Sequence, residues 1–193
     1  MYAKKHLIFF PVCVICVLSC ASIPKNEPLY VNLTDNSKFV LLPTEDIELD
    51  MDMPQSFSTE FRGQNYFFNA WVIANENAIE MAFFNEMGTS VGELSYRNGE
   101  VNFSSNVIPK AVMRYIKPEN VIADFQLCFY DPIQLSKSLK DCGLVLETDD
   151  GGRRILDGNE VIVDIKKTDN TVELVNHLRG YAYTLEGDFH EIR

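Results

Sequence analysis

The sequence predicts a mainly β protein: a strongly curved antiparallel sheet of about eleven strands, a half-barrel, with helices packed against its concave face. Three observations support this fold class. Turn-forming residues recur about every dozen positions along the chain. Apolar and polar residues alternate between these turns, and a stretch with helical periodicity interrupts the strands near the middle of the sequence.

The N-terminal segment has the parts of a secretory signal peptide. Lys4 and Lys5 precede an apolar run from Leu7 to Leu18, and Ser19 and Cys20 follow it. The run is shorter than the roughly 20 apolar residues of a membrane-spanning helix. Its end resembles the lipobox of bacterial lipoproteins, in which the cysteine receives a diacylglycerol. We therefore expect residues 1–19 to be removed and Cys20 to be lipidated, the alternative being an ordinary signal peptide with an incidental cysteine.

Composition divides the rest of the chain and excludes some functions. Residues 20–37 are rich in proline and polar residues and predict a flexible tether, which leaves residues 38–193 as one folded domain. Loss of Lys4 and Lys5 leaves 15 of the 17 basic residues against 28 acidic ones, a balance that disfavours nucleic-acid binding. The spacing of Cys128 and Cys142 matches no metal motif, so we expect neither a metal nor a cofactor. A disulfide between them stays open, although two separate thiols are the favoured outcome.

The strands are predicted from the turns and the alternation. Asn98-Gly99 is the strongest hairpin signal, because both residues accept the positive φ of a tight turn. Val101 and Phe103 alternate with polar residues after this turn, and Val163 and Ile165 do the same further along. Such alternation is typical of strands with one wet face and one buried face.

The helical interruption is predicted from its termini. Pro109, Pro118 and Pro132 each suit the first turn of a helix, where a missing N–H is harmless. Asp131 with Gln134 forms a potential capping box, and Gly143 follows the last expected turn. We expect these helices to bury an apolar stripe against the sheet.

Several strings in this order resemble the LolB family of outer-membrane lipoprotein receptors, and more closely a family of small LolB-like lipoproteins of unknown function. They are Leu42-Pro43, Phe68-Asn69-Ala70, the segment from Gly92 to Gly99, the segment from Ile122 to Leu127, Arg154-Ile155-Leu156, and the segment from Gly180 to Leu185. The resemblance spans roughly residues 40–187. It implies a LolA/LolB-like half-barrel with an apolar interior that holds acyl chains.

The resemblance also implies the site and the partners. The ligands would be a lipid or a lipoprotein acyl chain, delivered by a LolA-like donor protein to an anchored receptor on the periplasmic side of the outer membrane. Met87 corresponds to the apolar tip of a membrane-facing loop. The side chains expected to line the cavity are Phe57, Phe61, Phe68, Val72, Ile79, Met81, Phe83, Leu94, Phe103, Val163, Leu174 and Tyr183.

Two alternatives stay open. The same inward residues could fill a dry core, because alternation predicts which side chains point inward but does not show whether they leave a cavity. The protein would then be an envelope interaction module whose acidic face docks a cationic partner. An enzyme that acts on lipid is supported only by Asp124 and by the isolated residues His177 and His190. We therefore expect a protein without enzymatic activity.

Overall fold

The computed structural model describes residues 28–47, 50–61, 64–108 and 117–189; for residues 59–61 and 64–66 it describes the backbone only. Its main element is an antiparallel sheet of ten strands. The strands are β3 (Met51–Phe61), β4 (Gln64–Asn75), β5 (Ala78–Phe84), β6 (Ser90–Arg97), β7 (Glu100–Ser104), β8 (Leu144–Asp149), β9 (Gly152–Asp157), β10 (Glu160–Lys167), β11 (Thr171–Asn176) and β12 (Tyr181–Glu186).

The sheet consists of two meanders joined at its centre. Strands β3 to β7 pair in sequence, and so do β8 to β12. The join is made by β3 and β12, whose antiparallel register aligns Phe57 with Leu185 and Thr59 with Tyr183. The first strand of one meander therefore lies beside the last strand of the other, and β7 and β8 form the two edges.

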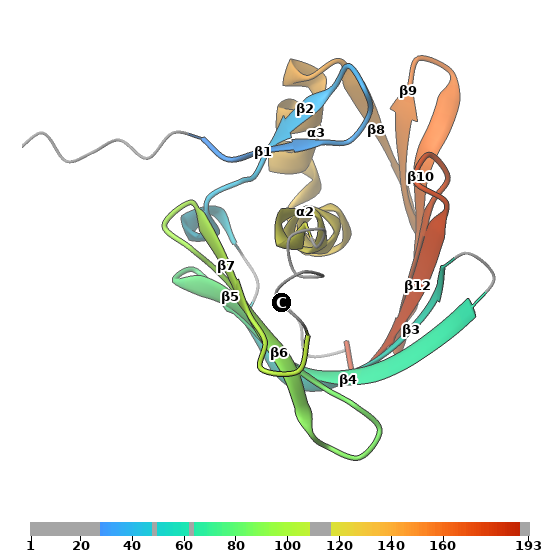
Figure 1. Ribbon diagram of the computed structural model, residues 1–193. Helices are drawn as coiled ribbons and strands as arrows, with labels where there is room; N and C mark the ends of the chain where they lie inside the picture. Colours follow the sequence, from blue (N-terminus) through green and yellow to red (C-terminus); the bar gives the residue numbers. More distant parts are fainter. Residues whose placement is uncertain (1–27, 48–49, 62–63, 109–116, 190–193) are drawn as a thin grey trace, which may run out of the picture.

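The mainly β prediction is confirmed, but the sheet is less curled than expected. The strands and two helices are present, while the edges β7 and β8 do not pair and the sheet does not curl strongly into a half-barrel. In Figure 1, α2 lies between the two arms of the sheet.

The helices begin and end where the sequence predicts. They are α2 (Pro118–Phe129) and α3 (Pro132–Asp141), each with proline in its first turn. Asp131 Oδ1 accepts hydrogen bonds from the backbone N–H groups of Ile133 and Gln134, at 2.9 and 3.1 Å, and caps α3. Gly143 follows with a φ of +84°, as a helix C-terminus favours. Neither helix of the described chain is long and apolar enough to cross a membrane, and Pro109 lies outside the described residues.

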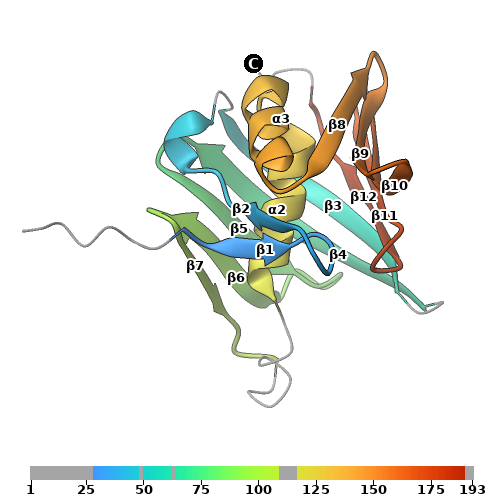
Figure 2. The ribbon, with the colours of Figure 1, turned by 90° about the horizontal axis from the view of Figure 1, so that it is seen from above.

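The N-terminal segment is more ordered than the predicted tether. Strands β1 (Tyr30–Asn32) and β2 (Lys38–Val40) form a separate antiparallel pair that crosses near α2 and α3 (Figure 2). Val31 and Phe39 of this pair are fully buried. Residues 28–37, which the sequence assigns to the tether, thus include a strand and apolar side chains that contribute to the core. Residues 20–27 lie outside the described residues.

A side-chain amide fastens this N-terminal segment to α2. Gln126 Oε1 accepts a hydrogen bond from the Leu42 N–H at 2.9 Å, and its Nε2 donates to the Leu42 carbonyl at 2.8 Å. Tyr96 Oη donates to the same carbonyl at 2.9 Å. The Gln126 amide thus pairs with the Leu42 backbone as a neighbouring strand would. Although this side chain is buried, both its oxygen and its nitrogen have hydrogen-bond partners.

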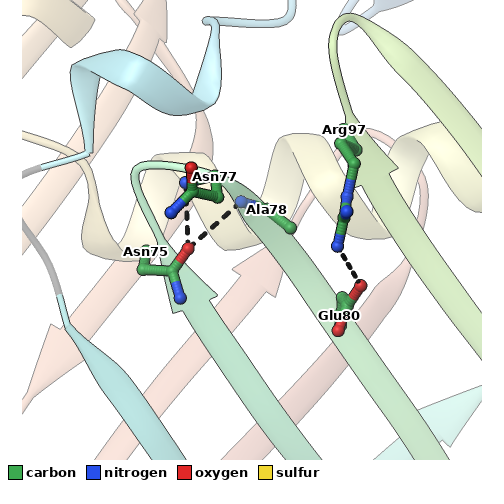
Figure 3. A network of polar contacts seen from close by, with 5 residues as sticks. All are labelled: Asn75, Asn77, Ala78, Glu80 and Arg97. Carbon is green, nitrogen blue, oxygen red and sulfur yellow. Dashed lines mark hydrogen bonds and ion pairs between the residues drawn. The ribbon is translucent and has the colours of Figure 1, made fainter.

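Polar contacts close the hairpin between β4 and β5, at the end of the sheet opposite the turn after β5 (Figure 3). Asn75 Oδ1 accepts hydrogen bonds from the N–H groups of Asn77 and Ala78, at 2.9 and 3.3 Å. An exposed ion pair joins Arg97 Nη2 to Glu80 Oε1 at 2.8 Å across β5 and β6. Exposed pairs of this kind contribute less than about 1 kcal/mol, so the turn geometry sets the register here.

Candidate ligand-binding cavity

A cavity of about 600 Å³ lies between the N-terminal half of α2 and the inner face of β3–β7 and β12. Its apolar lining consists of Phe57, Phe67, Phe68, Met81, Phe83, Val91, Phe103, Ile108, Val121, Phe125 and Leu185. Its remaining lining residues are Gln55, Asn85, Gly92, Asn120, Asp124, Tyr181 and Tyr183. No Lys, Arg or His is among the described residues that line it. The cavity is therefore apolar with one acidic group.

Three phenylalanine rings form one wall of the cavity. Phe57, Phe68 and Phe83 come from the adjacent strands β3, β4 and β5 and project to the same face. The rings of Phe57 and Phe68 are stacked with centroids 5.1 Å apart, and Phe83 meets them edge-on at 6.3 and 5.8 Å. Each ring remains partly exposed. This wall offers apolar surface that a hydrocarbon chain would cover favourably.

The rim of the cavity is also apolar. Phe67 at the start of β4 is 60% exposed, and Val121 in the first turns of α2 is 38% exposed, although both line the cavity. Apolar side chains that reach solvent therefore border the cavity.

Asp124 is the acidic group of the wall. Its Oδ2 accepts a hydrogen bond of 2.5 Å from Tyr181 Oη, and Asn176 Nδ2 donates to the same tyrosine oxygen at 3.3 Å. Burial raises the pKa of Asp124 to about 7, against the smaller lowering effects of the Tyr181 hydrogen bond and the charge of Arg179. The carboxyl group therefore exchanges its proton near neutral pH.

The described inner face of β8–β11 has no large apolar cavity, and the smaller pocket at one end of these strands, of about 370 Å³, is lined mainly by polar residues such as Arg153 and Lys167. Four side chains on this face have exposed fractions of at most 2% and belong to the hydrophobic core: Val163, Leu174, Ile155 and Ile165. We call this region the filled half, and the lining of the cavity the hollow half. The two halves share α2, whose first turns face the cavity.

Six of the residues predicted for the cavity line it, and five do not. The lining residues are Phe57, Phe68, Met81, Phe83, Phe103 and Tyr183. The residues buried in the packed core instead are Val72, Ile79, Leu94, Val163 and Leu174. Val163 and Leu174 lie in the filled half, and all five belong to one core cluster with Phe39 and Leu41 of the N-terminal segment. The side chain of Phe61, and Cys20 entirely, lie outside the described residues.

The sequence prediction missed several lining residues that had a readable signal. Tyr181 and Leu185 share a strand face with Tyr183, because side chains two positions apart point the same way. Asp124 and Phe125 follow Val121 at helical spacing. Phe67 had no such signal, since alternation with Phe68 places it on the other face.

Met87 lies at the tip of the turn between β5 and β6, beside the cavity. Asn85 Oδ1 accepts hydrogen bonds from the N–H groups of Met87 and Thr89, at 3.0 and 2.9 Å, and Gly88 adopts a φ of +74°. The Met87 side chain is 86% exposed. Asn85 and Val91, which flank the turn, both line the cavity. The turn thus holds an apolar side chain in solvent next to the opening.

The C-terminal end of α2 has a different chemical character. Arg153 Nη1 donates to the Leu127 carbonyl at 2.9 Å, and Lys167 Nζ lies 5.3 Å from the ring centre of Phe129. Cys128 is a buried free thiol whose pKa is raised to about 12, mainly by burial, and Cys142 is also free. Among the described residues, no cluster of His, Cys, Asp or Glu could hold a metal ion. These groups stabilise the helix end and offer no reactive thiolate.

The fold and the cavity define an antiparallel β-sheet protein with an internal, mostly apolar cavity. The chain belongs to DUF3261, a family described as protein of unknown function, whose family model matches residues 52–187. The match runs from β3 to the end of β12 and so includes the large sheet, both helices and the cavity. It does not show the expected relation to LolB. A comparison with curated proteins finds no match.

Proposed function

We propose that this protein is a lipid-anchored envelope protein that binds a lipid or acyl chain in the cavity. It would act as a carrier or receptor in the localisation of lipids or lipoproteins, in the manner of LolB. The observation that carries the proposal is the cavity of about 600 Å³ with its phenylalanine wall. Ligand sites typically have volumes of about 300–1,000 Å³ and mostly apolar walls.

The energetics favour a hydrocarbon chain as the ligand. Each buried methylene contributes about 0.8 kcal/mol, so a chain inserted along the rings of Phe57, Phe68 and Phe83 gains affinity with its length. The described residues that line the cavity include no cation that would attract an anionic end into it. This arrangement suits an acyl chain better than a polar metabolite.

The anchor and the location are part of the proposal. Cys20 would carry the lipid anchor, and Ala21 in place of an aspartate favours the outer membrane, with the domain facing the periplasm. A LolA-like protein would be the donor of the ligand. Met87 would enter the bilayer surface during transfer, since burial of such a side chain gains about 1.5 to 3 kcal/mol.

No catalytic residue is assigned. Asp124 is paired with Tyr181 in the cavity wall, and His177 is exposed in the turn after β11, away from the cavity lining. A lipid enzyme would need a nucleophile or an activated water next to such groups. The proposed role is therefore binding and transfer.

Probe binding to a plugged cavity tests this function. N-phenylnaphthylamine fluoresces in apolar sites, and we expect saturable binding that fatty-chain ligands displace. Val121→Trp, at the rim, should weaken probe binding at least tenfold, because the indole occupies the opening. Val175→Trp is the matched control: Val175 is 36% exposed on β11 and does not line the cavity.

The alternative function predicts different results. An interaction module with a filled core would show no saturable probe binding, or equal binding by wild type and Val121→Trp. Either result would contradict the carrier function and favour a search for a cationic partner protein.

A further inference from the structure

The described cavity lining contains one carboxyl group, which the acyl-chain function does not use. Asp124 lies in the cavity wall and accepts a hydrogen bond from the Tyr181 hydroxyl group, whose oxygen accepts one from the Asn176 side chain. These three residues come from α2, β12 and β11, so the arrangement is built by the tertiary fold. A buried carboxyl group in an apolar site is costly and is retained where it has a partner or a role.

These hydrogen bonds decide whether Asp124 and Tyr181 can donate a hydrogen bond to a ligand or only accept one. The only O–H proton of Tyr181 is directed to Asp124 Oδ2, at 2.5 Å. The tyrosine therefore cannot donate to a ligand while this bond exists. An ionised Asp124 carries only acceptors. The wall at this point thus offers hydrogen-bond acceptors and negative charge.

Among the described residues, the cation that acts on Asp124 lies outside the cavity lining. The charged and titratable groups around Asp124 are Tyr181, Tyr183, Cys128 and Arg179. Arg179 lies outside the lining of the cavity, and its guanidinium donates to the backbone carbonyl of Asn32. Because no cation is among the described lining residues, a carboxylate or phosphate drawn into the cavity would meet the Asp124 charge with only the outlying Arg179 to offset it, which disfavours both negative charges.

We infer that the cavity selects acyl ligands whose inserted end bears a hydroxyl group, such as a fatty alcohol or an acylglycerol, and that Asp124 accepts its hydrogen bond and repels free fatty acids. This inference rests on the proposed function and names its ligand class. Because burial raises the pKa of Asp124 to about 7, the repulsion of a carboxylate should grow as the pH rises through neutrality.

Displacement of N-phenylnaphthylamine by ligands of one chain length tests the inference on the full mature protein. Dodecanol has a donor and no charge, methyl laurate has neither, and laurate has a negative charge. At mildly alkaline pH, wild type should bind dodecanol at least tenfold more tightly than laurate, with methyl laurate between them. Asp124→Asn should reduce the preference for dodecanol over laurate to threefold or less, because the amide keeps an acceptor and loses the charge.

Two further variants test whether the Asp124 carboxyl group itself causes the preference for dodecanol over laurate. Glu93→Gln removes one negative charge from an exposed position outside the cavity lining and should leave the preference unchanged. Tyr181→Phe removes the hydroxyl group but keeps the acid, so the preference should persist. The wild-type ranking is informative even if Asp124→Asn does not fold.

The outcomes distinguish this inference from the function on which it rests. Equal displacement by laurate and dodecanol in wild type, or an unchanged preference in folded Asp124→Asn, would overturn the selectivity and leave acyl-chain binding intact. Absence of any saturable probe binding would overturn the proposed function itself.

Discussion

The hollow and filled halves of the interior share α2 and the same alternating pattern, yet in the described residues only the hollow half contains a large apolar cavity. In the hollow half, Phe57, Phe68 and Phe83 pack against one another and stay partly exposed. In the filled half, aliphatic residues such as Ile155 and Leu174 are completely buried. Branched aliphatic side chains interlock closely, whereas stacked rings on neighbouring strands contact each other and leave space beyond their faces.

This difference indicates where stability and function reside. The filled half resembles an ordinary protein interior, in which each removed methyl group costs free energy. The hollow half keeps apolar surface uncovered, a cost that a bound ligand would recover. The hollow half also contains the buried acid Asp124. Substitutions in the two halves should therefore have opposite profiles in stability and in ligand binding.

The largest expected effect comes from a matched pair of leucines. Leu174 in the filled half and Leu185 in the cavity wall are both buried on adjacent strands. Leu174→Ala should lower the free energy of unfolding by about 2–5 kcal/mol. Leu185→Ala should cost less, because part of that side chain faces space already empty, but it should alter probe affinity. Urea unfolding and probe titration measure the two effects; equal stability losses with equal binding changes would remove the distinction between the halves.

The next effect is a pH dependence of stability from Asp124. Its pKa is about 7 in the folded state against an ordinary 3.8, so the folded protein binds more protons between these values. The free energy of unfolding should fall as the pH rises from about 4 to about 7 and level off above that, a change of up to a few kcal/mol. Asp124→Asn should lose this contribution.

The measurement is urea unfolding across this pH range, with the curve of Asp124→Asn subtracted from that of wild type. Glu93→Gln serves as the control for loss of one exposed carboxylate. Parallel curves for wild type and Asp124→Asn would show that Asp124 titrates at an ordinary pKa and that the hollow half holds no buried acid.

The smallest effect on stability is expected at the cavity-side turn. Met87 is 86% exposed, so Met87→Glu should change the free energy of unfolding by no more than about 0.5 kcal/mol. It should nevertheless weaken association with lipid vesicles and slow transfer of a bound ligand to them, because a carboxylate opposes insertion. Met87→Leu is the apolar control. Unchanged transfer by Met87→Glu would exclude Met87 from membrane contact.

Local features of the fold could be predicted from the sequence. Asn98-Gly99 adopts the positive φ values of a hairpin, and Pro118 and Pro132 begin α2 and α3. These signals are local, because each residue restricts its own backbone. The pairing of β3 with β12 has no local signal, since it joins segments more than a hundred residues apart. The burial of Val31 likewise depends on distant elements and overrode the tether-like composition around it.

For the cavity, the sequence could predict only which side chains point to the inner face of the sheet. Alternation placed Phe68 and Leu174 on inward faces, and both predictions of direction hold. Whether an inward residue faces empty space depends on which element covers it, and α2 covers the two residues differently. The hydrogen-bond partner of Asp124 could not be predicted from the sequence either, because Tyr181 lies 57 positions away. Tertiary packing decides both points.

The central claim is that an acyl chain occupies the hollow half. Intermolecular nuclear Overhauser effects between dodecanol and the isotope-labelled protein test it most directly. We predict contacts from the chain protons to the rings of Phe57, Phe68 and Phe83, and none to Leu174. Contacts confined to the outer face of the sheet, for example to Trp71, or no contacts at saturating dodecanol, would contradict the claim.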